Sequence, residues 1–373
     1  MTASLDFFTA STQQLLDDIR DIVECESPSA DLEAVSRSAD VISTIGLRLL
    51  DAAPERLVID GCTHLRWVLG DGPRRVLLLG HHDTVWPVGT LAEHPWTVED
   101  GAIRGPGTFD MKVGLVMALH AAASLPRTAP ITILITGDEE IGSTSSRQLI
   151  EAAAVDAVAA LVLEASADGG ALKTARKGVS NYRVEVTGRA AHAGLEPDNG
   201  INATIELAHQ VLAIAAMGSR EKGTSVVPTV SSAGTTTNTV PARASLSVDV
   251  RAWSADEQWR VDHDIRSLRP ALDGAAITVT GGPDRPPLEE AKASELFAVA
   301  CRVAEDLGLP TLRRAQVGGA SDGNLTAGAG TPTLDGLGAV GGGAHADHEH
   351  ALVAEIPRRV ALLAGLVGRL TDS

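Results

Sequence analysis

Three short apolar stretches of this sequence end in residues that can bind a metal ion or transfer a proton. Residues 131–140 end in three consecutive acids, residues 76–83 end in two histidines and an aspartate, and residues 160–164 end in Glu164. Apolar, β-branched runs of this length predict buried strands, which have no structural need for such endings. In open α/β sheets, ligands gather outside the carboxyl ends of the parallel strands. We therefore expect the three ends to meet in one crevice and to form a metal site there.

The spacing within these endings indicates how the residues divide the chemistry. Asp83 lies two residues after His81, which suits a carboxylate that holds an imidazole in one orientation. Adjacent carboxylates on an extended backbone point to opposite sides, so one of Glu139 and Glu140 can bind metal while its neighbour acts as a base. A polar loop and a solvated charge cluster are the alternative explanations for the two motifs.

Two further segments offer ligands. Asp110 precedes an expected helix, where it could either cap the helix or bridge two metal ions. His345, His348 and His350 follow a glycine-rich tract that lets backbone approach a site closely, although such histidines could also be solvent-exposed. Nitrogen and oxygen donors of this kind suit zinc. Two metals ~3.5–4 Å apart would share one carboxylate and activate a bridging water.

The pattern of helices and strands that must position these residues changes along the chain. Strands alternate with helices up to about residue 178, which predicts a mainly parallel sheet. The period-two alternation of residues 182–187 instead indicates a half-exposed strand, and residues 179–284 predict an α+β unit with an antiparallel sheet. We therefore expect an α/β domain, residues 1–178 and 285–373, with helices on both faces of its sheet and an inserted domain at 179–284. Residues 281–287 predict a hinge, and residues 84–110 a long loop.

Composition limits the possible partners. The chain has 48 acidic and 31 basic side chains and a net charge of −17, which argues against nucleic acid and anionic membranes. Cys25, Cys62 and Cys301 are too few and too far apart to imply a disulfide framework. No apolar run approaches the length of a membrane span, and the N-terminus has acids where a signal peptide needs a basic region. These features predict a cytoplasmic protein.

Three motifs give the sequence a resemblance to a known family. Gly80-His-His-Asp-Thr-Val85, Gly105-Pro-Gly-Thr-Phe-Asp-Met-Lys112 and Gly137-Asp-Glu-Glu-Ile-Gly-Ser143 resemble signatures of the di-zinc metallopeptidases. That family includes glutamate carboxypeptidase (carboxypeptidase G type), succinyl-diaminopimelate desuccinylase, aminoacylase and peptidase T. The resemblance runs over essentially the whole chain and is strongest to the glutamate carboxypeptidase branch.

The resemblance implies a role for each motif residue. One zinc ion would be held by His81 and Glu164 and a second by Glu140 and His345, with Asp110 bridging them; cobalt or manganese could substitute. Asp83 would orient His81, Glu139 would be the general base, and the Asp110–Met111 peptide would be cis.

In the inserted domain the resemblance implies dimerisation and substrate binding. His192 would reach the active site of the partner subunit of a homodimer and polarise the scissile carbonyl, so this domain would serve as a dimerisation or lid domain. Asn238 and Arg251 would bind the substrate carboxylate. Weaker candidates for substrate contacts are Arg176, Lys177, Arg285 and the loop that contains Gly318 and Gly319.

These inferences predict a zinc-dependent hydrolase that cleaves an amide bond to an amino acid with a free carboxylate. Its substrate would be a small peptide or an N-acyl amino acid, so a deacylase or desuccinylase of the same family is the alternative. A more remote alternative is a metal-binding scaffold that catalyses no reaction. Ala165 and Ser166 stand where the carboxypeptidase branch commonly has proline, and Val113 where the family usually has glycine, so substrate identity stays open.

Overall fold

The computed structural model describes residues 4–372, and the chain forms two compact units. Unit 1 comprises residues 1–175, 290–317 and 321–373, and unit 2 comprises residues 176–289 and 318–320. The sequence predicts the inserted domain at residues 179–284, whereas unit 2 spans residues 176–289 and also takes residues 318–320. The dimerisation role of the inserted unit remains a prediction.

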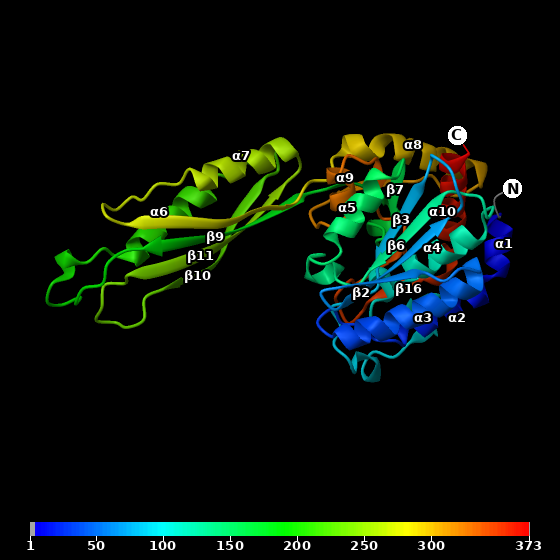
Figure 1. Cartoon of the computed structure of the whole chain (residues 1–373), viewed down its shortest axis with the longest axis horizontal. Helices are drawn as coiled ribbons and strands as arrows, with labels where there is room; N and C mark the ends of the chain where they lie inside the picture. Colours follow the sequence, from blue (N-terminus) through cyan, green and yellow to red (C-terminus); the bar gives the residue numbers. More distant parts are fainter. Residues whose placement is uncertain (1–3, 373) are drawn as a thin grey trace. The chain divides into compact units, whose positions relative to one another are not determined.

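Unit 1 is built on a six-stranded sheet in the order β1-β2-β6-β3-β7-β14 (Figure 1). The four strands β6, β3, β7 and β14 run parallel to one another, and β1 and β2 add an antiparallel edge. The strands are β1 (Glu55–Ile59), β2 (Cys62–Leu69), β3 (Val76–His81), β6 (Ile131–Thr136), β7 (Ala159–Val162) and β14 (Thr333–Leu334). The expected mainly parallel sheet is confirmed.

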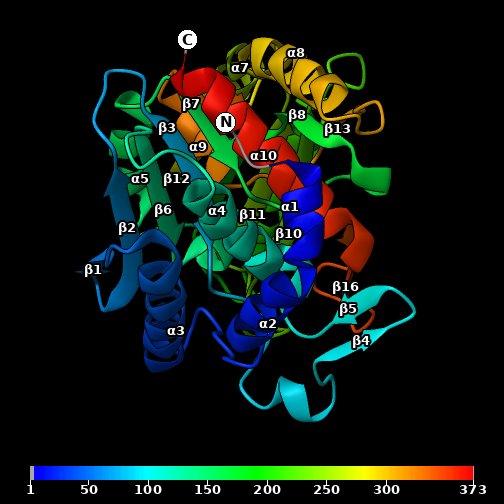
Figure 2. The same cartoon turned by 90° about the vertical axis from the view of Figure 1, so that its right-hand side faces the viewer.

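Helices cover both faces of this sheet because its central strands are apolar on both sides. Val76 and Leu78 of β3 face one cluster, to which α4 and α10 contribute, whereas Leu77 and Leu79 face another, to which α5 and α9 contribute. Figure 2 shows α4 and α10 beside each other across the first face. The helices of unit 1 are α1 (Leu5–Ala10), α2 (Thr12–Val23), α3 (Leu32–Leu50), α4 (Val113–Ala123), α5 (Arg147–Val155), α8 (Glu290–Asp306), α9 (Asp322–Gly328) and α10 (Ile356–Thr371).

Unit 2 is an α+β sandwich. Its four strands are antiparallel in the order β10-β11-β9-β12, and its two helices pack on one face of the sheet against Tyr182, Val184 and Val186. The elements are β9 (Gly178–Thr187), β10 (Ser225–Ala233), β11 (Arg243–Ala252), β12 (Ala276–Arg285), α6 (Ala203–Ala215) and α7 (Ala255–Arg266).

The structure corrects several expectations for local elements. The segment expected to be a hinge at 281–287 is instead mostly strand, because β12 continues to Arg285. Pro283 is tolerated there because β12 is an edge strand. The apolar spacing of residues 4–25 predicts one helix, but the structure divides this segment at Ser11 into α1 and α2.

Short strands also occupy regions where none was expected. The loop expected at 84–110 contains β4 (Thr97–Glu99) and β5 (Ala102–Arg104), which form a small sheet with β15 (Gly341–Gly342) and β16 (His350–Leu352). Strand β8 (Leu172–Arg176) was not expected either; it pairs with β13 (Arg314–Val317), which lies within residues 311–317, where the sequence does predict a strand. Among residues 4–372, no helix combines the length and apolar character needed to cross a bilayer.

Candidate metal centre

The register of the parallel strands brings His81 and Glu164 to the same level at the edge of the sheet. Leu79 of β3 pairs with Val162 of β7, and each ligand candidate lies two residues further along its strand direction. Strand β6 ends at Thr136, directly opposite His81, and the acids of residues 138–140 follow it. The sheet therefore delivers residues from three strand ends to one place, as the rule for open α/β sheets predicts.

Asp110 lies between two histidines that come from different parts of the chain. Its Oδ1 is 3.3 Å from His81 Nε2, and its Oδ2 is 3.3 Å from His345 Nε2. The helix-capping explanation for Asp110 does not apply, because the residue at the N-cap of α4 is Lys112 and no side chain caps that helix end. The Asp110–Met111 peptide is cis.

Each histidine also has a glutamate of its own. His81 Nε2 lies 3.6 Å from Glu164 Oε1, and His345 Nε2 lies 3.2 Å from Glu140 Oε1. A carboxylate oxygen of Glu139 lies within 4.8 Å of ligand atoms of His81 and Glu164. The arrangement is therefore two imidazole–carboxylate pairs that share Asp110, with Glu139 beside the first pair.

Asp83 connects the two strand ends that supply the acids. Its Oδ1 accepts a hydrogen bond from the Glu139 backbone N–H and its Oδ2 from the Glu140 backbone N–H, both at 3.1 Å. Ser29 Oγ donates to Asp83 Oδ2 at 2.6 Å, and His81 Nδ1 lies 3.4 Å from Asp83 Oδ1. One buried carboxylate thus positions both His81 and the backbone of the acidic turn.

Glu349 performs a similar task for Asp110, and sequence reasoning missed it. Its Oε1 accepts hydrogen bonds from the backbone N–H groups of Phe109 and Asp110 at 2.8 and 3.0 Å. Its Oε2 accepts from the Gly107 N–H at 3.0 Å and from Trp86 Nε1 at 2.8 Å. The only sign of it in the sequence is an acid inside the His345–His350 tract, where the histidines are the more evident ligand candidates.

Asp138 stabilises the acidic turn, residues 138–140, through hydrogen bonds. Its carboxylate accepts hydrogen bonds from the side-chain hydroxyls of Ser145 and Ser146, at 2.7 and 2.6 Å, and from both backbone N–H groups. His64 Nε2 lies 3.1 Å from Ser145 Oγ, and its Nδ1 accepts from the Gly137 N–H at 3.2 Å. Asp138, which the sequence left without a role, therefore stabilises the turn that carries Glu139 and Glu140.

The electrostatics of the cluster favour positive charge inside it. Hydrogen bonds to Asp110 and Glu140 raise the pKa of His345 to about 10. Burial opposes a proton on His81, but Asp110, Asp83 and Glu164 outweigh it and raise the pKa of His81 well above its usual value. Burial raises the pKa of Glu140, although His345 opposes that shift.

The residues fit a divalent cation by their donor chemistry. Asp110 Oδ1 is buried and accepts no hydrogen bond within residues 4–372, although carboxylate oxygens at such positions normally find a partner. Imidazole nitrogens and carboxylate oxygens are the donors that zinc and similar metals take. Two such donor pairs sharing one carboxylate have the pattern of a dinuclear site.

Comparison with known proteins identifies the lineage of this fold and site. The profile of Peptidase family M20/M25/M40 matches residues 77–369, which include the parallel strands of the sheet almost entirely, the inserted unit and all the acids described above. The chain belongs to this family. It is therefore a hydrolase, and the resemblance found in its sequence is confirmed.

Individual relatives of this M20-family chain differ in activity. Carboxypeptidase G2 of Pseudomonas sp. (strain RS-16) is 29% identical over 382 residues, which cover 96% of this chain and 91% of that protein. Acetylornithine deacetylase of Proteus mirabilis (strain HI4320) is 31% identical over 181 residues, covering 46% of this chain and 44% of that protein. Aminopeptidase PepT of Bacillus cereus has a similar structure, with a TM-score of 0.78, 23% identity and coverage of 96% and 98% of the two chains.

In unit 2 of the M20-family chain, His192 and Asn238 lie on adjacent segments. The Ala193 N–H donates to the Asn238 carbonyl at 2.9 Å, and His192 pairs with Thr239 across a β-bridge. His192 Nδ1 accepts hydrogen bonds from the Gly194 and Leu195 N–H groups, both at 3.1 Å. The neutral imidazole therefore carries its proton on Nε2, which can donate it to a carbonyl oxygen.

The expected basic residues of unit 2 fall into two groups. Arg251 of β11 and Arg285 of β12 both lie opposite Val179 of β9, which places them in one row across the sheet. Arg176 donates to the carbonyls of Gly319 and Ala320, which positions the loop that begins at Gly318. Lys177 Nζ donates to the Gly223 carbonyl at 2.5 Å and lies 5.2 Å from the centroid of the Trp253 ring.

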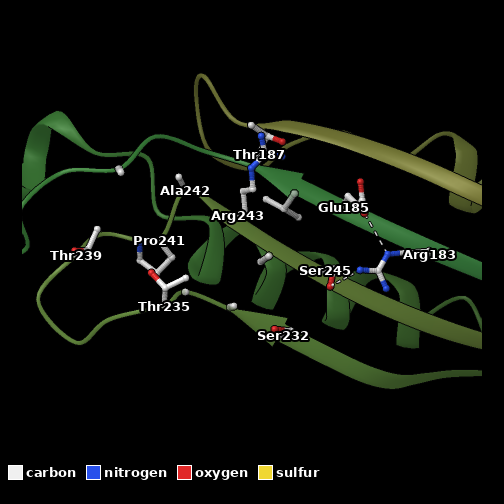
Figure 3. A pocket seen from close by; sticks show the side chains of 15 residues that line it. Arg183, Glu185, Thr187, Ser232, Thr235, Thr239, Pro241, Ala242, Arg243 and Ser245 are labelled. Atoms are coloured by element: carbon white, nitrogen blue, oxygen red, sulfur yellow. Dashed lines mark hydrogen bonds and ion pairs between the residues drawn. The ribbon is translucent and has the colours of Figure 1, made fainter.

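A hollow of about 450 Å³ lies on the sheet face of unit 2 that α6 and α7 do not cover (Figure 3). Arg183 lies within it, paired with Glu185 at 3.2 Å and donating to Ser245 Oγ at 3.2 Å. The hollow extends to Thr239, which adjoins Asn238. It lies wholly in unit 2 and includes none of the metal-ligand candidates.

Proposed function

We propose that the chain is a metal-dependent amidohydrolase that cleaves the amide bond to an amino acid with a free carboxylate. The observation that carries the proposal is the position of Asp110, whose two oxygens each face a different histidine at 3.3 Å. Each histidine has a separate glutamate partner, which is the ligand pattern expected for two metal ions.

His81 and Glu164 would hold one ion, Glu140 and His345 the other, and Asp110 would bridge them. We propose zinc because its preferred donors are these nitrogens and oxygens. A dinuclear metal-binding M20 peptidase of Bacillus subtilis, YxeP, shares the fold with a TM-score of 0.67, 15% identity and coverage of 98% and 99% of the two chains. Bound metal ions polarise a carbonyl group and lower the pKa of a water molecule.

The protein's own residues perform the proton transfers. Glu139 accepts a proton from the water that attacks the carbonyl carbon, and it donates a proton to the amine nitrogen as the C–N bond breaks. Asp83 keeps Glu139 in place through the backbone N–H of that residue. The Nε2–H of His192 donates to the carbonyl oxygen as negative charge develops on it.

The substrate carboxylate is assigned to unit 2. Arg251 offers a guanidinium that can bind a carboxylate with two parallel hydrogen bonds, and Asn238 offers an amide donor close to His192. Arg251 is paired with Asp249 at 2.9 Å, so substrate competes with that ion pair. We propose Arg285 as a second cation of the same row, and Arg176, Lys177 and the Gly318–Gly319 loop as supports of the pocket.

A homodimer through unit 2 would supply His192 to the partner subunit. Strand β10 is an edge strand and exposes Val230 with 67% of its surface accessible. Helix α6 packs beside β10 and exposes Ile205 and Leu212, seven residues apart and therefore on one helical face. Exposed apolar residues gathered at a sheet edge favour a contact with a second chain.

A peptidase and an N-acyl-amino-acid deacylase remain two versions of this function, and relatives of both kinds exist. The test is a substrate panel on purified protein of measured zinc content. N-acyl glutamates, dipeptides with a free carboxyl terminus and the matching C-terminal amides are compared. Removing the carboxylate removes charge-assisted hydrogen bonds, so kcat/KM should fall roughly 10- to 100-fold for the amides.

The same assay tests the metal. A chelator should abolish hydrolysis, and added zinc, cobalt or manganese should restore it. Equal rates for free acids and their amides would overturn the assignment of a carboxylate-directed enzyme. Hydrolysis that continues in protein shown to contain no metal would overturn the metal-dependent mechanism.

A further inference from the structure

A second hollow lies in unit 1, beside the first two turns of α10. Its volume is about 280 Å³. Glu355, Arg358, Arg359 and Leu362 line it, at a spacing that places all four on one face of the helix. The facing wall is the segment 309–313, and the floor comes from Gly169, Gly170 and Val340. None of the residues proposed to bind metal or substrate lines this hollow.

Arg359 is the unusual residue of the hollow. Its side chain is only 5% exposed, and its Nη2 donates to the Gly170 carbonyl at 2.6 Å. Its Nη1 is buried and has no hydrogen-bond partner among residues 4–372. An unsatisfied N–H donor on a buried charged group is costly, so Nη1 indicates an acceptor that residues 4–372 do not supply.

Other positive groups gather at the same place. Arg313 donates to the Gly169 carbonyl at 2.9 Å, so two guanidinium groups bind consecutive carbonyls of one loop. Arg358 and Arg359 lie in the first turns of α10, and Glu355 at the N-cap of this helix pairs with Arg358. Basic residues near a helix N-terminus oppose the helix dipole, and a bound anion relieves that repulsion.

We propose that this hollow binds a small organic carboxylate, with its charged end at Arg359 and Arg313 and its apolar part against Leu312 and Leu362. The planar fork of a guanidinium matches a carboxylate in shape. The leucines favour a ligand with a short hydrocarbon portion. Only burial, partly offset by Glu355, lowers the pKa of Arg359, to about 10, so this arginine stays charged at neutral pH.

A monovalent carboxylate suits the hollow better than a phosphate. The loop at Gly169 and Gly170 turns its carbonyl oxygens toward the arginines, whereas phosphate sites usually present backbone N–H groups. The Glu355 carboxylate, 2.6 Å from Arg358 Nη1, adds further negative charge. Both features repel a dianion more strongly than a monoanion.

The ligand would contact two segments that lead to the metal centre. Gly170 lies six residues after Glu164, and Val340 lies five residues before His345. The two segments are joined by hydrogen bonds from the Gly338 N–H to the Glu164 carbonyl and from the Ser166 N–H to the Ala339 carbonyl, both at 2.8 Å. The proposed carboxylate site therefore shares its floor with the scaffold of the metal centre.

The test is calorimetric titration of the full chain with 4-methylpentanoate, using 4-methylpentanamide and inorganic phosphate as comparison ligands. Arg313→Gln and Arg359→Gln should each weaken carboxylate binding about tenfold or more, since each removes a charged hydrogen-bond donor. The matched control is Arg369→Gln, which removes an exposed arginine from the same helix at a position outside the hollow. It should bind like wild type. Arg251→Gln, in unit 2, is measured separately to show whether the proposed substrate pocket binds the same probe.

Binding by wild type and by Arg369→Gln, with loss in Arg313→Gln, supports the proposal even if Arg359→Gln fails to fold. Unchanged binding in a folded Arg313→Gln protein overturns it. Loss of binding in Arg251→Gln also overturns it, because the carboxylate would then be bound in unit 2. Equal binding of the amide, or tighter binding of phosphate, overturns the assignment of a carboxylate ligand.

Discussion

At the scale of single residues, the adjacent acids Glu139 and Glu140 should have separable roles. Glu139→Gln keeps the size of the side chain but cannot accept a proton. We expect the variant to retain wild-type zinc content and to lose about 10²- to 10⁴-fold in kcat. Glu140→Gln should instead lose zinc, because it removes the glutamate that lies 3.2 Å from His345. Zinc analysis and steady-state kinetics on both variants test the division, and full turnover in Glu139→Gln contradicts it.

Glu349 is expected to act on the metal through Asp110. Its carboxylate accepts three backbone N–H groups of the segment 107–110, and an amide in its place would turn an N–H₂ group toward some of these donors. Glu349→Gln should therefore weaken zinc binding about 10- to 100-fold, as the loss of groups that orient ligands typically does. Competition with a chromogenic chelator measures the affinity.

Asp347→Asn provides the matched control for Glu349→Gln. Asp347 lies in the same tract, but its side chain is 84% exposed. The substitution would remove an ion pair between Asp347 Oδ1 and His94 Nε2, which lie 3.7 Å apart. The Asp347→Asn variant should bind zinc with wild-type affinity. If both variants retain wild-type affinity, Glu349 stabilises the loop without positioning a ligand.

At the scale of elements, the sequence predicted best where local pattern and tertiary role agree. The strands that contain Val76 and Ile131 are apolar on both faces, and the structure buries every residue of both. The cap of α3 is equally local, because the Asp31 carboxylate accepts the Glu33 and Ala34 N–H groups at 3.1 and 3.0 Å. These features depend on neighbours in the chain, which a sequence displays directly.

Elements that depend on distant partners were not predicted. Strand β5 is three residues long and pairs with β16 from the other end of the chain, so no local periodicity marks it. The role of Glu349 in the site could not be predicted for the same reason, because the N–H groups that it binds lie about 240 residues earlier in the chain. Long-range pairing, rather than residue type, determines these features.

Helix α7 should make unit 2 sensitive to acid through Glu257. Hydrogen bonding from Arg260, reinforced by Lys222 and Thr224, outweighs burial and lowers the pKa of Glu257 to about 2, from 4.5. The unfolded chain therefore takes up this proton first as pH falls. The stabilisation is complete well above pH 4.5 and is lost as pH falls from there toward about 2.

Glu257→Gln should accordingly destabilise the protein at pH 7 and flatten the acid dependence of its free energy of unfolding. The difference from wild type should shrink by at most about 1.4 kcal/mol per pH unit below pH 4.5. Urea unfolding followed by circular dichroism at several pH values measures it. Asp264→Asn, which removes a more exposed partner of the same Arg260, should cost less than about 1 kcal/mol. An unfolding difference that does not change with pH contradicts the assignment.

At the scale of the whole molecule, the proposed chemistry is divided between the two units. The metal-ligand candidates and Glu139 belong to unit 1, whereas His192, Asn238 and Arg251 belong to unit 2. If His192 acts in the partner subunit, one chain that lacks Glu139 and another that lacks His192 should complement each other. In a mixed dimer, the intact Glu139 of one chain would meet the intact His192 of the other at one of the two sites.

Random exchange between equal amounts of His192→Ala and Glu139→Gln chains makes about half of the dimers mixed, each with one complete site. The mixture should therefore recover about a quarter of wild-type activity, with wild-type KM at the restored sites. Differently tagged chains, purified through both tags, isolate the mixed dimer and raise the expected value to about one half. Mixed dimers that stay as inactive as their parents would show that His192 acts within its own chain or not at all. Recovery of activity would mean that each active site combines Glu139 of one chain with His192 of the other, because neither variant chain has both residues.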